Sequence, residues 1–83
     1  MYKSTADAVT SLQSVVTGDA RYPDITAQLV VTYVLGEVED GPALIAAGKL
    51  IMAIGLYRRD VGPDTSAITL YAGELAHRLA NLA

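Results

Sequence analysis

A run of sixteen residues, PALIAAGKLIMAIGLY from Pro42 to Tyr57, contains a single ionisable side chain, Lys49. A helix built from this run would be apolar on nearly every face. Such a helix has to be covered by other helices, by partner subunits or by lipid, because packing on one side alone cannot hide it. We therefore expect both the fold and the assembly of this chain to be organised around this segment.

The composition agrees with that expectation. Eighty-three residues make one domain, and a chain of this size buries only about 60–68% of its unfolded surface. Counted with glycine and without tyrosine, apolar residues make up roughly 54% of the sequence, against a usual 45–50%. This is more apolar material than one small core requires, which indicates a homo-oligomer.

Charge and cysteine content argue against several classes of protein. The formal net charge is −3 and only six residues are Lys or Arg. Duplex nucleic acid is bound through clustered positive charge, so we expect no duplex nucleic acid as a partner. The absence of cysteine removes disulfides and thiolate zinc sites, and fits a cytoplasmic protein. The opening residues, MYKSTAD, lack the apolar stretch of a secretory signal, so secretion has no support.

The first helix is predicted over residues 5–17. Ser4, followed three residues later by Asp7, is typical of a helix start, and apolar residues then recur at helical spacing up to Gly18. The opposite face carries hydroxyl and amide side chains without charge. We expect that face to be solvated.

The second helix is predicted over residues 24–36. Pro23 disfavours helical geometry in the residue before it and suits the first turn of a helix. The run LVVTYVL over residues 29–35 is also apolar and β-branched enough for a buried strand. A single strand would have no partner in this sequence, so the helix is the better interpretation.

The apolar run predicts a third helix over residues 42–59. Pro42 suits the first turn, with Asp40 or Gly41 as the cap. Acidic residues precede this segment and Arg58 and Arg59 end it, so both signs complement the helix dipole.

A fourth helix is predicted over residues 65–82. Residues 61–64 break the chain, a cap is available among Asp64, Thr65 and Ser66, and an apolar stripe follows. Glu74 and Arg78 are spaced for an ion pair on its surface. The fold class is therefore all-α, a compact four-helix domain with the nearly all-apolar third helix as its central element.

A membrane span is a weaker interpretation of the apolar run. The run is shorter than the roughly 20 residues that cross a bilayer, and a lysine at mid-helix adds about 2.5–3.5 kcal/mol against insertion. The small residues along it suit close approach between helices. We expect no membrane partner.

One spacing resembles a metal site. Glu74 and His77 form a Glu-x-x-His step that places both side chains on one helical face, as in carboxylate-bridged di-metal bundles. Such a site needs further glutamates on other helices and a second Glu-x-x-His step. His77 is the only histidine, so we prefer the interpretation that Glu74 and His77 are simply solvated side chains. We expect no metal and no cofactor.

Catalysis has no sequence support either. The chain lacks a nucleophile elbow and a dinucleotide-binding glycine motif, and Gly48-Lys49 resembles the end of a phosphate-binding loop without its Ser or Thr. No cleft with two titrating groups can be assembled. We expect a protein that is not an enzyme.

Two groups of residues remain as candidate contacts. Lys49, in the middle of the apolar run, has to reach an acid, a carbonyl, a ligand phosphate or the surface, because an unpaired buried amine is costly. The step Tyr57-Arg58-Arg59 at the helix end could stack on and neutralise an anionic group, although complementing the helix dipole explains the arginines equally well.

The sequence therefore predicts a non-catalytic interaction or regulatory module, an adaptor, inhibitor or small subunit, that acts as a homo-oligomer and binds another protein. The alternative is an oligomer that binds a small anionic ligand such as a nucleotide, with Lys49, Arg58, Arg59 and tyrosines lining a pocket between subunits. The residues predicted to bind a partner or ligand are Lys49, Tyr57, Arg58, Arg59, Leu70 and Tyr71.

Overall fold

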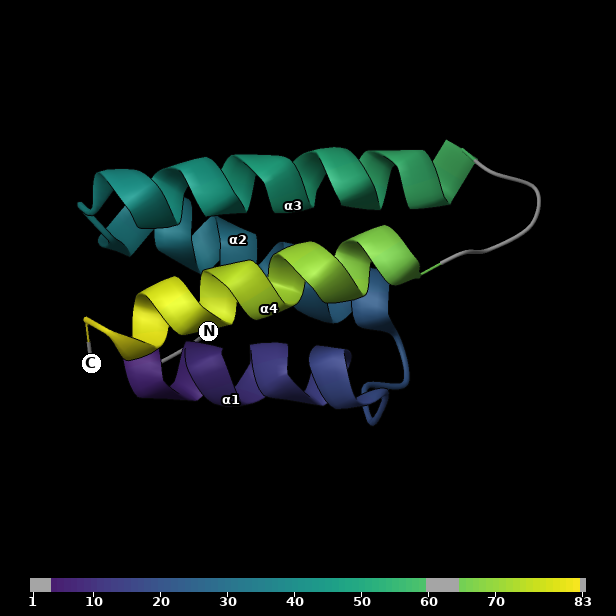
Figure 1. The fold of residues 1–83 in the computed structure, drawn as a ribbon, viewed down its shortest axis with the longest axis horizontal. Helices are drawn as coiled ribbons and strands as arrows, with labels where there is room; N and C mark the ends of the chain where they lie inside the picture. The colour runs from purple at the N-terminus through teal and green to yellow at the C-terminus, as the bar shows by residue number, and fades with distance from the viewer. Residues whose placement is uncertain (1–3, 60–64, 83) are drawn as a thin grey trace.

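Four helices make up most of the computed structural model, which describes residues 4–59 and 65–82. α1 spans Thr5–Thr17, α2 spans Pro23–Glu37, α3 spans Gly41–Arg59 and α4 spans Ser66–Ala80. Successive helices run in opposite directions and lie along one common axis (Figure 1). The described residues contain no strand, so the predicted all-α four-helix fold is confirmed.

The helix starts follow from local hydrogen bonding. The backbone N–H of Asp7 donates to the Ser4 hydroxyl at 3.3 Å, which caps α1 as the sequence predicts. α1 ends at Gly18, whose φ of 84° lies in the left-handed region that glycine adopts without strain. The Asp40 carboxylate accepts the N–H of Ala43 at 3.0 Å and caps α3.

The strand-like run in residues 29–35 is helical. It lies within α2, which starts at Pro23, and its side chains Val30, Val31 and Val34 are buried on one side of the helix. Burial against three other helices outweighs the preference of β-branched residues for strands, because that preference is small and depends on context.

The fourth helix begins and ends close to its predicted bounds. Thr65 occupies the cap position of α4 without a side-chain hydrogen bond to the helix, and the helix ends at Ala80, two residues earlier than expected. The predicted chain break over residues 61–64 lies outside the described residues.

The position of α3 differs from the prediction in one respect. Within the described residues α3 packs against α2 and α4 and does not contact α1, whereas α2 and α4 each contact all three other helices. α3 thus lies along one outer edge of the bundle (Figure 1). A helix at such an edge buries only the part of its surface that faces its two neighbours.

The core consists of one apolar side of each helix. α3 contributes mostly small side chains to it, and α4 contributes larger ones such as Leu75 and Leu79. No buried side-chain nitrogen or oxygen in the described residues lacks a hydrogen-bond partner. The buried members of α3 are Ala43, Ala46, Ala47, Leu50, Ala53 and Ile54.

Candidate interaction surface on α2 and α3

Large apolar side chains are concentrated on the outside of α2 and α3. Seven of the eleven exposed large hydrophobic residues in the described part of the chain belong to these two helices. Single exposed apolar residues are normal on protein surfaces, but a contiguous group is typical of an interaction site. The seven are Ile25, Leu29, Leu35, Ile45, Ile51, Met52 and Leu56, and of the three on α2 only Leu35 lines a hollow shared with α3.

The most exposed members follow one line along α3. Ile45, Met52 and Leu56 are 63%, 70% and 57% exposed. Their separations of seven and four residues place them on one face of a helix. This face points away from the core, because the buried residues of α3 lie on its opposite side. The sequence predicted that α3 would be apolar on nearly every face and would have to be covered, and in the single chain one apolar face is exposed.

Two shallow hollows connect this line to α2. One, of about 330 Å³, is lined by Ile51, Met52, Gly55, Leu56 and Arg59. The other, of about 270 Å³, runs between α2 and α3 and includes Leu35, Ile51 and Gly55. The two hollows share Ile51 and Gly55, so the hollowed surface continues from α3 to the edge of α2, where polar Gln28, Thr32 and Arg58 also line it.

Two glycines, Gly48 and Gly55, lie on the same side of α3. A Cβ atom added at either position would meet nothing within 4 Å in the chain. Glycine inside a helix costs about 0.5–1 kcal/mol relative to alanine. Nothing in the fold of the single chain therefore requires glycine at these positions. We define the α3 face as Ile45, Gly48, Ile51, Met52, Gly55 and Leu56.

Lys49 is not part of this apolar line. Its ammonium group lies 3.3 Å from the Glu74 carboxylate of α4, and both side chains are partly exposed. Lys49 thus reaches an acid at the surface, which is one of the outcomes that the sequence allowed. The predicted pair between Glu74 and Arg78 is not formed in the described residues; Glu74 pairs with Lys49 instead, because α3 brings the lysine across from the neighbouring helix.

Arg58 lies on the other flank of α3. Its guanidinium is 3.3 Å from the Asp24 carboxylate in the first turn of α2. Nine residues separate Lys49 from Arg58, which corresponds to about 13 Å along the helix and about half a revolution around it. The structure therefore does not bring these two cations together within one chain.

The three consecutive residues at the end of α3 point in different directions. Tyr57 is half-buried and packs against the core, Arg58 faces α2, and Arg59 is exposed and lines the hollow beside Met52. Consecutive helical residues differ by about 100°. The Tyr57-Arg58-Arg59 step is therefore not a single binding corner.

The two predicted contacts on α4 also separate. Leu70 is 65% exposed, whereas its neighbour Tyr71 is half-buried and packs against the core. Leu70 is the only exposed large apolar residue within α4. As an isolated side chain it is weaker evidence for an interface than the α3 face.

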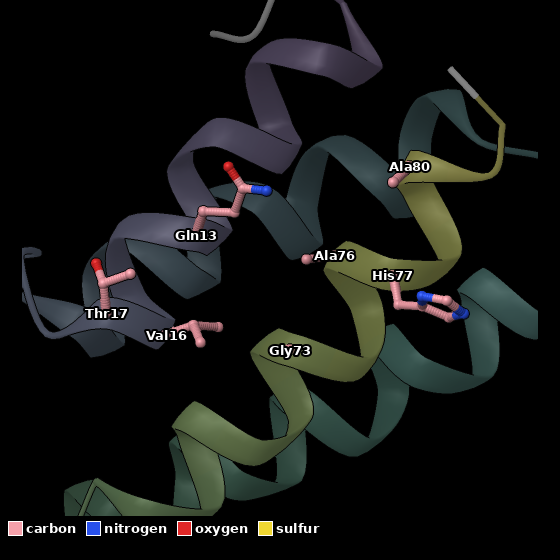
Figure 2. Close-up of a pocket in the computed structure, with 7 residues that line it drawn as sticks. All are labelled: Gln13, Val16, Thr17, Gly73, Ala76, His77 and Ala80. Carbon is pink, nitrogen blue, oxygen red and sulfur yellow. The ribbon is translucent and has the colours of Figure 1, made fainter.

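A further hollow, of about 500 Å³, lies between α1 and α4 (Figure 2). Gln13, Val16 and Thr17 border it on α1, and the His77 ring extends to the other side of the α4 ribbon from them. Glu74, the other half of the Glu-x-x-His step, is engaged by Lys49. Among the described residues no group of three His, Cys, Asp or Glu could hold a metal ion.

None of the four helices, as far as the structure describes them, combines the length and the apolarity that crossing a bilayer requires. The chain matches no protein-family model, no curated protein and no solved structure. We therefore infer function from the residues of the chain itself.

Sequence reasoning missed most of the α3 face as a site. It selected charged and tyrosine side chains near the apolar run, whereas the exposed residues are the aliphatic ones inside it. One signal was present in the sequence: Ile45 and Met52, like Gly48 and Gly55, are seven residues apart. A spacing of seven keeps residues on one side of a helix over several turns.

Proposed function

We propose that this protein is a non-catalytic interaction module that forms a homo-oligomer through the α3 face. The observation that carries the proposal is the line of Ile45, Met52 and Leu56, three large apolar side chains each more than half exposed on one face of the longest helix. Removing apolar surface from water contributes about 25 cal/mol per Å². A partner that covers this line would supply the shielding that the single chain lacks.

An ordinary interface would cover a modest share of this chain. A stable complex buries about 800 Å² on each partner, which is roughly one-sixth of the 5080 Å² of accessible surface of this chain. The continuity of the α3 face with Leu35 on α2 extends the apolar area in the direction that such an interface needs.

Within this proposal the protein is an adaptor, an inhibitor or a small regulatory subunit that also binds another protein. Leu70 and Tyr71 on α4 remain the predicted contacts for that second partner. A cytoplasmic location is part of the proposal, and it depends on the absence of cysteine from the sequence.

The alternative, a small anionic ligand held between subunits, is less well supported. Two of its three predicted cations, Lys49 and Arg58, already pair with carboxylates on opposite flanks of α3. An anion would have to displace Glu74 or Asp24 to reach them. Of these three cations, Arg59 alone forms no ion pair with another described residue.

A matched pair of variants tests the proposal. Leu56→Lys places a charge in the α3 face, and Leu29→Lys makes the same change on α2 at a leucine of almost equal exposure, 57% against 56%. Leu29 lies one turn before Tyr33, whose hydroxyl is 3.3 Å from the Thr5 hydroxyl of α1, so it faces away from α3. Both leucines are solvent-exposed, so neither change should unfold the chain.

Light scattering of the native protein should give a multiple of 8.7 kDa. Leu56→Lys should weaken the assembly at least tenfold, whereas Leu29→Lys should keep the native mass. A monomeric native protein at high concentration would contradict the proposal. Native mass spectrometry of protein from its own host tests for the second partner. A bound polypeptide would support the adaptor role, and a bound metabolite would support the ligand alternative.

A further inference from the structure

The charges at the two ends of the α3 face have opposite signs. Glu37 and Glu39 are exposed just before α3 begins, and Arg59 is exposed where it ends. Within residues 4–59 and 65–82 none of the three forms an ion pair with another residue. The apolar line therefore runs between an acidic end and a basic end.

We propose that two copies of the chain pair through the α3 face in antiparallel orientation, about a two-fold axis near Met52. This inference rests on the proposed homo-oligomer and specifies its geometry. The partner that the surface fits is thus a second copy of this chain.

The charge pattern selects the antiparallel orientation. In that arrangement the Arg59 end of each α3 meets the acidic end of the other, so opposite charges face each other twice. A parallel pair would place Arg59 beside its own copy and Glu39 beside its own copy. Like charges at both ends oppose that arrangement, and the aligned helix dipoles oppose it as well.

Gly48 and Gly55 define a register for the antiparallel pair. When Gly48 of one helix lies opposite Gly55 of the other, two-fold symmetry creates that contact twice, on either side of the axis. Neither glycine has a neighbouring atom in its own chain that a Cβ would touch, so the space above them is open to a second helix. Helix axes approach to about 8 Å where small residues meet, and about 10 Å where large ones do.

The register also places the remaining members of the α3 face. With Gly48 opposite Gly55, Met52 and Ile51 of the two copies meet at the axis, and Leu56 is level with residue 47 of the partner subunit. Arg59 is then level with residue 44 of the partner subunit. Gly41, where α3 begins, is three residues or about 4.5 Å further along, and Glu39 lies two residues before it, so Arg59 ends beside the acidic end of the partner.

Single cysteines test this geometry, because the native chain contains none. A disulfide needs Cα atoms about 4.4–6.8 Å apart. Met52→Cys lies next to the proposed axis, so mild oxidation should convert the dimer to a covalent one. Ile45→Cys lies about 20 Å from its own copy in the antiparallel pair, so the same oxidation should leave it unlinked. Both residues are exposed, so the variants should fold.

Charge reversal gives an independent measurement. Arg59→Glu should weaken the dimer a few-fold at low salt, and adding Glu39→Arg in the same chain should restore the native affinity. A matched single change, Arg78→Glu on α4, should leave the affinity unchanged.

The outcomes separate the two proposals. Cross-linking of Ile45→Cys as efficiently as Met52→Cys would establish a parallel pair and overturn the antiparallel geometry. A native mass of two chains without cross-linking of Met52→Cys would overturn it as well, while leaving the homo-oligomer intact. A native mass of one chain would overturn the proposed function itself.

Discussion

The two halves of the bundle, α1 with α4 and α2 with α3, differ in how many large apolar side chains they expose to water. α1 and α4 together expose two large apolar residues, Val16 and Leu70, whereas α2 and α3 expose seven. Both halves contribute comparably to the core, with buried residues on one side of every helix. The difference lies entirely on the outer surface. Folding of the single chain explains the pattern of α1 and α4, but it does not explain the outer surface of α3.

The contrast shows that a helix can be apolar all round without being central. α3 buries its alanines against α2 and α4 and leaves Ile45, Met52 and Leu56 outside. Leu50 and Ile54 are the only large side chains of α3 in the core, whereas four large apolar side chains of this helix are exposed. This arrangement supports the proposal that the exposed side chains of α3 serve a contact outside the chain.

The largest expected effect comes from comparing one leucine in each half. Leu75 of α4 is fully buried and Leu56 of α3 is exposed. Leu75→Ala should lower the free energy of unfolding by about 2–5 kcal/mol, because it removes apolar contacts and leaves a cavity. Leu56→Ala should change it by less than about 0.5 kcal/mol in dilute solution, where the chain is monomeric. Urea denaturation of both variants measures the difference. Equal effects would show that Leu56 is also a core residue.

A smaller effect is expected from overfilling the inner side of α3. Ala47 is fully buried between helices, so Ala47→Leu should destabilise the fold by about 1–3 kcal/mol. Thermal unfolding should show a lower Tm than that of the parent. An unchanged Tm would mean that α3 can move outward at little cost, and that its inner face is less tightly packed than its burial indicates.

Local signals in the sequence were sufficient to predict where the first three helices begin. Ser4, Pro23 and Asp40 mark the starts of α1, α2 and α3, and each acts through its nearest backbone neighbours. The helix over residues 29–35 required one further argument, the lack of a second strand. These features depend on residues close in sequence, which is why the sequence alone predicts them.

The orientation of α3 could not be predicted from the polarity of its own residues. An all-apolar helix has no polar stripe to show which side faces water, so Ala47 and Ile51 look equally suited to the core. The ion pairs could not be predicted either, because the two partners of each pair lie far apart in the sequence. Lys49 and Glu74 are 25 residues apart, so their contact depends on how α3 and α4 pack. The nearer candidate for Glu74, Arg78, was the only one that helix periodicity could identify.

Gly48 lies on the outer side of α3, whereas its neighbour Ala47 is buried on the inner side. A Cβ at position 48 meets open space, so Gly48→Ala should stabilise the monomer by about 0.5–1 kcal/mol through the lower entropy of the unfolded chain. Gly18→Ala is the matched control and should destabilise, because residue 18 has a φ of 84°. Chemical denaturation at low protein concentration separates the two. A loss of monomer stability in Gly48→Ala would contradict the outward position of this residue.

The smallest effect is expected at Lys49, which borders the α3 face. Its pair with Glu74 is partly exposed, with 48% and 34% of the two side chains accessible, and exposed pairs contribute about 0–1 kcal/mol. Lys49→Met should therefore change the stability of the monomer by less than about 0.5 kcal/mol. The variant should also associate at least as tightly as the parent, because it extends the apolar line from Ile45 to Leu56. Sedimentation at several protein concentrations measures this. Weaker association in Lys49→Met would mean that the lysine itself contacts the partner. The α3 face would then include residue 49.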